Sequence, residues 1–200
     1  MRNSAMVVCL VLLLAACGQP ADSVRAEGML VRPADNPYKI PAAGLVNPDP
    51  RVGLDPLWVA FKDPRFDYAF ARVSRPGGGS IVAQVASALW LGEAPAPGTE
   101  VGLIGYAAGI GGKPVGCENS TGITDGYPSF SCAGLVVGTS GSPWIRGSTV
   151  TGVTGGLQGG GCTPTVSYSA PFNQRTAALL ARAEAGGRSQ VPPFAFLGGC

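Results

Sequence analysis

The sequence predicts an all-β protein with one helix near its carboxy terminus. Of its 200 residues, 31 are glycine and 18 are proline, so about a quarter of the chain favours turns. Hydrophobic residues make up 46% of the chain. They occur in short runs that alternate with turn-forming residues, which is the pattern of strands joined by loops. Many short strands of this kind are typical of a β-sandwich or β-barrel.

The composition excludes several classes of function. Charged residues make up only 13% of the chain and the formal net charge is +2, whereas nucleic-acid binders carry a basic stripe and disordered chains are charge-rich. The sequence contains no histidine, so neither a histidine-ligated metal nor an imidazole base can come from this chain. We expect no nucleic-acid partner, no metal and no cofactor, and we expect a monomer.

The amino terminus has the order of an export signal. Arg2 precedes the apolar run Ala5–Ala16, which is too short to span a bilayer. The run ends in Leu-Ala-Ala-Cys, which resembles the lipobox of bacterial lipoproteins and implies lipidation at Cys17. We therefore predict a signal peptide over residues 1–16 and an extracytoplasmic protein, either secreted or held at the cell surface by a lipid anchor only. The alternative is a buried strand of an ordinary domain.

The cysteine pattern predicts disulfides. One of the six cysteines leaves with the signal and Cys17 carries the lipid, so four remain in an oxidising compartment. Four cysteines permit three pairings. We favour Cys117–Cys132, which closes a short loop, and Cys162–Cys200, which ties down the carboxy terminus. A zinc site is the rival interpretation, but the chain offers neither a CxxC motif nor a histidine.

The order of the elements predicts one folded domain between two irregular ends. Residues 17–55 are rich in Pro, Ala and Asp, and we expect a tether and irregular chain there, with at most one strand near Met29–Val31. The domain spans residues 56–187 and a tail spans 188–200. The predicted strands are Leu57–Phe61, Tyr68–Val73, Ser80–Val85, Val101–Tyr106, Phe130–Val137, Thr149–Thr154 and Thr165–Tyr168.

One segment near the end has the character of a helix. Phe172–Ala185 is rich in strong helix formers. The pair Gly186-Gly187 follows it, and glycine is the usual residue at a helix carboxy terminus. We therefore predict a helix over this segment.

The chemistry-bearing motif is the hexapeptide Gly138-Thr139-Ser140-Gly141-Ser142-Pro143. A serine becomes a nucleophile when a tight turn exposes its hydroxyl and directs backbone N–H groups at the oxyanion that forms. Glycines near Ser140 permit such a turn and leave room for a substrate. The alternative interpretation is an ordinary Gly/Ser hairpin loop.

The hexapeptide resembles the GxSGxP nucleophile loop of trypsin-like (chymotrypsin-fold) serine peptidases of the actinobacterial secreted type. Four other stretches resemble, in order, the strand start with the triad aspartate, the strand that opens the second barrel, the substrate-binding strand, and the closing strand before a terminal helix. They are Asp67–Phe70, Val101–Tyr106, Thr149–Gly156 and Gly159–Phe172. The resemblance covers Leu57 to about Ala185. It implies a two-barrel fold with a truncated first barrel, an intact second barrel and a C-terminal helix.

The resemblance also implies a role for each matching residue. Ser140 is the nucleophile, the N–H groups of Gly138 and Ser140 form the oxyanion hole, and Asp67 orients an imidazole. Gly134 lies at the position where the family sets its preference for the substrate side chain. A glycine supplies no anion there, so the sequence does not support a preference for Lys or Arg. The residues that would pair with the substrate main chain are Thr154, Gly155 and Gly156.

The chain departs from the family in lacking the histidine that accepts the serine proton. Only Lys39, Lys62 and Lys113 offer another base, and too few residues precede Asp67 for all the opening strands. The chain has lost its base and first strands, or its start is misplaced, or a partner supplies them. We therefore predict a serine endopeptidase homologue that hydrolyses peptide bonds through an acyl-enzyme on Ser140. The alternative is an inactive surface lipoprotein that binds extended peptides in the same cleft.

Overall fold

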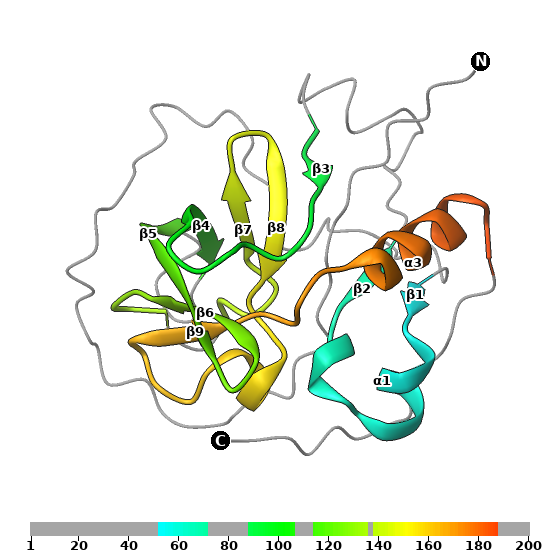
Figure 1. Ribbon diagram of the computed structural model, residues 1–200, viewed down its shortest axis with the longest axis horizontal. Coiled ribbons are helices and arrows are strands. Elements are labelled where there is room, and N and C mark those ends of the chain that lie inside the picture. The colour runs from blue at the N-terminus through cyan, green and yellow to red at the C-terminus, as the bar shows by residue number, and fades with distance from the viewer. Residues whose placement is uncertain (1–51, 72–87, 107–113, 136–137, 188–200) are drawn as a thin grey trace, which may run out of the picture.

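The computed structural model describes residues 52–71, 88–106, 114–135 and 138–187. These residues form a β-barrel on one side and a small lobe of short strands and helices on the other (Figure 1). The predicted signal peptide, the lipidation site at Cys17, the tail and the strands near 29–31 and 80–85 lie outside the described residues. Within the described ranges, no helix has the length and apolar character needed to cross a membrane.

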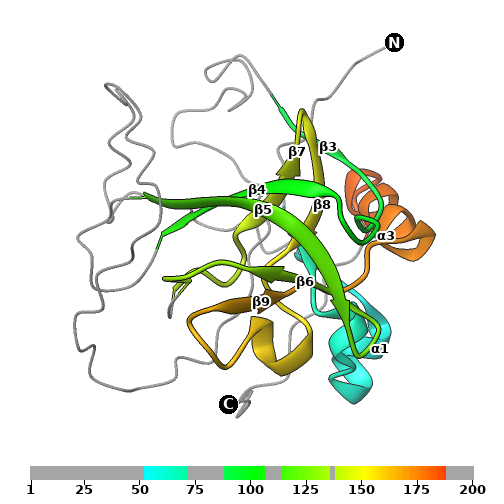
Figure 2. The ribbon, with the colours of Figure 1, turned by 60° about the vertical axis from the view of Figure 1, so that its left-hand side comes forward.

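The barrel is built from one sheet in the order β3-β8-β7-β4-β5-β6-β9. All neighbouring strands are antiparallel except β3 and β8, which are parallel. A bridge between Thr154 and Ser169 joins the end of β8 to the end of β9 and closes the barrel. Figure 2 shows β4 and β5 curving around it. The strands are β3 (Trp90–Leu91), β4 (Glu100–Tyr106), β5 (Pro114–Thr124), β6 (Tyr127–Ser131), β7 (Pro143–Arg146), β8 (Thr149–Val153) and β9 (Val166–Tyr168).

The barrel core follows from the alternation of side chains along its strands. In β4, Val101 and Leu103 are buried while Ile104 and Tyr106 are exposed, as expected for a strand with one face in a core. Phe130 and Trp144 pack against each other inside the barrel, with ring centroids 5.5 Å apart. The core is therefore filled by two aromatic rings and the aliphatic side chains around them.

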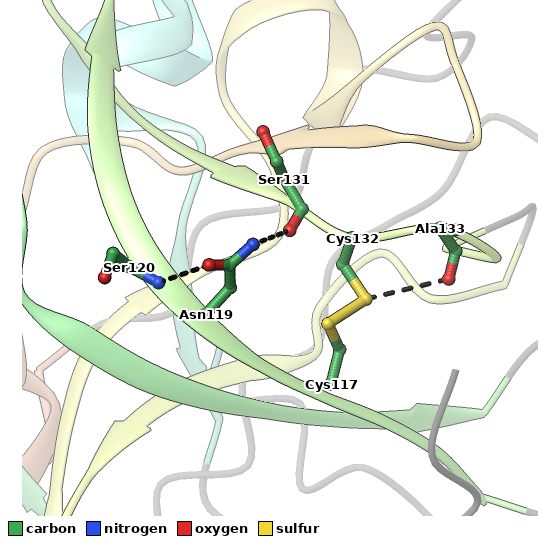
Figure 3. The surroundings of a disulfide bond; sticks show 6 residues. All are labelled: Cys117, Asn119, Ser120, Ser131, Cys132 and Ala133. Carbon is green, nitrogen blue, oxygen red and sulfur yellow. Dashed lines mark hydrogen bonds between the residues drawn. A yellow bond between two sulfur atoms is a disulfide. The ribbon is translucent and has the colours of Figure 1, made fainter. Parts of the chain in front are cut away.

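The predicted disulfide Cys117–Cys132 is confirmed (Figure 3). It joins β5 to the residue that follows β6. Nearby, the Asn119 side chain donates a hydrogen bond to the Ser131 carbonyl at 2.7 Å, so the two strands are linked covalently and by a side chain. Cys162 is also disulfide-bonded. Its predicted partner, Cys200, lies outside the described residues.

The small lobe begins earlier than the predicted domain boundary. Its elements are β1 (Val52–Leu54), α1 (Pro56–Phe61), the 3₁₀ helix η1 (Pro64–Phe66), β2 (Ala69–Ala71) and α3 (Gln174–Glu184). β1 pairs with β2 in an antiparallel sheet. A cluster that includes Phe70, Val153, Phe172 and Leu179 packs this lobe against the barrel. Residues 52–54, which were assigned to irregular chain, therefore form a strand of the folded body.

The predicted strand over Leu57–Phe61 is wrong, because these residues form α1. The reason lies in the two residues before it. The Asp55 side chain accepts a hydrogen bond from the Leu57 N–H at 2.8 Å, and Pro56 occupies the first helical position. An N-cap aspartate followed by proline is a strong helix start, and it overrides the β-propensity of the residues that follow.

Other strand predictions differ in extent. Those for β4, β8 and β9 are confirmed to within one residue at either end. The predicted strand Phe130–Val137 ends at Ser131, where β6 gives way to a turn. The strands β1, β3, β5 and β7 were not predicted. In β5, polar and glycine residues hide the alternation.

The predicted C-terminal helix is confirmed as α3. Asn173 caps it, since its side chain accepts from the Arg175 N–H at 2.8 Å and the Thr176 hydroxyl accepts from the Asn173 N–H at 3.1 Å. Gly186, at φ 76°, follows the last turn. The left-handed conformation that favours glycine thus terminates the helix as predicted.

Asp55 also ties α3 to the start of the lobe. Its side chain is 1% exposed and accepts from Arg175 Nε at 2.6 Å and Nη2 at 3.1 Å. A second N-cap aspartate, Asp63, pairs with Arg65 at the surface. Both aspartates therefore cap a helix and pair with an arginine, but Asp55 is buried whereas Asp63 lies nearer the surface.

We expect Asp55→Asn to lower the free energy of unfolding by about 1–3 kcal/mol, because asparagine keeps the cap but loses the charged hydrogen bonds. Asp63→Asn is the matched control and should leave stability nearly unchanged, since exposed ion pairs contribute little. Urea denaturation measures both. Equal effects of the two substitutions would show that the bonds from Arg175 to the buried Asp55 carboxylate do not hold the lobe together.

Candidate active site

The hexapeptide predicted to hold the nucleophile forms a tight turn that leads into β7. Gly138 and Gly141 have φ values of 97° and 83°, a region that disfavours residues with side chains. The Ser142 N–H donates to the Thr139 carbonyl at 3.0 Å and closes the turn. Of its three hydroxyl residues, Thr139 and Ser142 are buried and Ser140 is half-buried. The turn thus presents Ser140 toward solvent.

The N–H groups of this turn fall into two classes. Those of Gly141 and Ser142 donate to backbone carbonyls. Those of Gly138 and Ser140 have no acceptor in the part of the chain that the structure describes. The predicted oxyanion-hole donors therefore differ, within the described residues, from the two N–H groups that follow them.

Residue Thr154 holds the turn in place from the end of β8. Its carbonyl accepts from the Gly141 N–H at 2.8 Å, and its N–H donates to the Ser142 carbonyl at 2.9 Å. On the other side of the turn, the Ser142 hydroxyl occupies the space that a Cβ at Gly105 would need. Only glycine fits at position 105 while Ser142 stays in place.

Asp67 belongs to the small lobe, and its side chain contacts the segment Thr154–Gly156 that follows β8. It follows η1, and its Oδ2 accepts a hydrogen bond from the Gly156 N–H at 3.0 Å. A Cβ at Gly156 would collide with the backbone of Ala170 and Pro64, so the close approach of the two parts requires glycine. Burial raises the pKa of Asp67, while hydrogen bonds from Gly156 and the Trp58 side chain act in the opposite direction.

The structure therefore brings both predicted catalytic residues to one short segment. The Ser140 turn is bonded to Thr154, and Asp67 is bonded to Gly156. The residue between them, Gly155, donates to the Tyr168 carbonyl at 2.9 Å. All three residues of the segment are buried and their N–H groups have acceptors within the chain. A peptide that paired with Gly156 would have to displace Asp67.

The other predicted site residues make no hydrogen bond to Ser140 or Asp67 among the described residues. Gly134 sits in the turn after β6 at φ 87°, and its N–H donates to the Pro164 carbonyl at 2.9 Å. Lys62 donates through Nζ to the Val59 and Trp58 carbonyls at 2.9 and 3.3 Å and lies over the Trp58 ring. It therefore caps the end of α1. Lys39 and Lys113 lie outside the described residues.

No cluster of metal-ligating side chains occurs in the described ranges. The contact that sequence reasoning missed is made by Trp144, a fully buried residue of the barrel core. Its indole N–H donates to the Thr154 hydroxyl at 3.1 Å. A tryptophan next to the nucleophile motif is the only signal that could have indicated this contact.

Two solved structures share this fold. The thermostable serine protease AL20 from an extremophilic microorganism superposes with a TM-score of 0.57 at 20% identity, over 67% of this chain and 65% of that chain. Protease Anisep from Arthrobacter nicotinovorans gives a TM-score of 0.55 at 18% identity, again over 67% and 65%. The predicted all-β, chymotrypsin-like fold with a C-terminal helix is confirmed.

This chain spans 65% of the length of each of these two structures. At 18–20% identity, the likeness establishes the fold alone. No protein-family model and no curated protein sequence matches the chain. The roles of individual residues therefore rest on the geometry described above.

The raised pKa of Asp67 predicts a pH effect on stability. Above the ordinary value of 3.8, the unfolded chain loses a proton that the folded chain still holds, so this group's contribution to stability falls as pH rises. We expect the stability of Asp67→Asn relative to the natural chain to increase as pH rises from about 4. Urea denaturation at a series of pH values measures this.

Asp125→Asn is the control, because Asp125 lies exposed in a turn at φ 51°, where asparagine is well tolerated. The same pH series measured on this variant gives the baseline against which the change for Asp67→Asn is judged. A pH-independent difference for Asp67→Asn would contradict the burial of a titrating carboxyl at this position.

Proposed function

We propose that the protein is a trypsin-like serine endopeptidase homologue that acts on peptides or proteins outside the cytoplasm. The observation that carries the proposal is the pattern of N–H groups around Ser140. The two donors expected to bind an oxyanion are unused within the described residues, whereas the next two along the chain are bonded. This difference in bonding supports a site for acyl transfer, since one oxyanion-hole donor contributes about 3 kcal/mol to catalysis.

The chemistry follows from these positions. The Ser140 oxygen would add to the carbonyl carbon of a peptide bond, and the resulting oxyanion would accept hydrogen bonds from the Gly138 and Ser140 N–H groups. Collapse would expel the amine with a proton and leave an ester on Ser140, which water then hydrolyses. Asp67 would orient the base that carries the proton between these groups.

The sequence contains no histidine to act as that base. A triad that lacks one member keeps roughly 10³–10⁴-fold acceleration over water, far below the intact site. We therefore expect slow peptide hydrolysis by this chain alone. Fluorophosphonates depend less on a general base than a peptide substrate does, so we expect them to react at Ser140 still.

The absence of histidine specifically favours a second candidate, a non-catalytic lipoprotein that binds extended peptides. In this reading Thr154, Gly155 and Gly156 would pair with the peptide main chain, which requires a peptide to displace the acceptors that their N–H groups now have, Asp67 among them. The two candidates share a location, because a disulfide is typical of oxidising compartments. Both candidates include the features expected from the sequence, which are a signal peptide over residues 1–16, a lipid anchor at Cys17, a tether and a tail.

Labelling with a fluorophosphonate probe distinguishes the candidates. We expect the folded protein to form one adduct, located by mass spectrometry on Ser140, and added imidazole to accelerate the reaction by supplying the missing base. Ser140→Ala should abolish labelling. Ser148→Ala, at an exposed serine in the turn between β7 and β8, should leave it unchanged.

The non-catalytic candidate predicts no labelling of the folded protein with or without imidazole. Labelling that persists in Ser140→Ala would place the reactive group elsewhere and overturn the proposed role of this turn.

A further inference from the structure

A buried hydrogen bond connects the barrel core to the nucleophile turn. The Trp144 side chain is fully buried in the core, and its Nε1–H donates to the Thr154 hydroxyl at 3.1 Å. Thr154 itself is 3% exposed. An indole N–H at such a depth is costly to leave unpaired, so the bond fixes the threonine side chain relative to the core.

The backbone of the same threonine is bonded to the turn. Its carbonyl accepts from Gly141 and its N–H donates to Ser142, the two residues that follow Ser140. Thr154 thus links the core, through its side chain, to the turn, through its main chain. The direction of the Ser140 hydroxyl depends on where this backbone lies.

We infer that Trp144 and Thr154 are positioning residues for Ser140 and for the Gly138 and Ser140 N–H groups. The inference rests on the proposed function for the role of Ser140. It gives the core tryptophan a second task besides filling volume. Such positioning matters because a displacement of about 1 Å at a reacting group costs on the order of 10²-fold in rate.

The competing explanation is that the bond contributes only to stability. Three substitutions separate the two explanations. Thr154→Val keeps the shape but removes the acceptor, and Thr154→Ser restores the acceptor. Thr151→Val is the matched control, because Thr151 is also buried and its hydroxyl donates to the Trp144 carbonyl at 3.3 Å, but it makes no contact with the turn in the bonds described.

The experiment measures the rate of fluorophosphonate labelling at Ser140 and the hydrogen exchange of the Gly141 amide, with stability determined by urea denaturation. We expect Thr154→Val to slow labelling about tenfold or more and to accelerate Gly141 exchange. Thr154→Ser should restore both values to near those of the natural chain. Thr151→Val should lower stability while both readouts stay near the natural values.

Equal effects of Thr154→Val and Thr151→Val on both readouts would overturn the inference. If the natural chain is not labelled at all, the proposed function fails, but Gly141 exchange still decides whether Thr154 holds the turn. Should Thr154→Val fail to fold, adding Trp144→Phe removes both buried partners and should recover the fold. Labelling or Gly141 exchange at natural values in that double variant would also overturn the inference.

Discussion

The segment Thr154–Gly156 is the constraint on which the rest of the structure depends. Its three N–H groups are bonded to the nucleophile turn, to β9 and to Asp67 of the small lobe. Because a buried backbone group without a partner is costly, these bonds fix the barrel seam and both predicted catalytic residues at once. A shift of this segment would therefore disturb closure of the barrel and the geometry around Ser140 together.

The N–H groups of Gly138 and Ser140 contrast with this segment. No acceptor for them occurs among the described residues, whereas the Gly141 and Ser142 N–H groups donate to backbone carbonyls. Positive φ at Gly138 and Gly141 sustains this arrangement. Under the proposed function, this turn would supply the backbone part of an acyl-transfer site, although the sequence carries no imidazole.

Features encoded by local pattern were predictable from the sequence. Helix α3 has a cap and a terminal glycine, β4 alternates, and the Ser140 turn and Asp67 lie in motifs that resemble a known family. Strand β5 was missed because its polar residues pair with β4 and β6 only in the folded sheet. The bond between Asp67 and Gly156 joins residues 89 positions apart, and no local signal indicates such a contact.

The most direct measurement of this linkage is the scalar coupling across individual hydrogen bonds, recorded by long-range HNCO spectroscopy on labelled protein. The structure predicts cross-peaks from the Gly141 nitrogen to the Thr154 carbonyl carbon and from the Gly156 nitrogen to the Asp67 carboxyl carbon. If neither coupling is detected and both amides exchange as fast as those of an open loop, the segment does not join the nucleophile turn to Asp67.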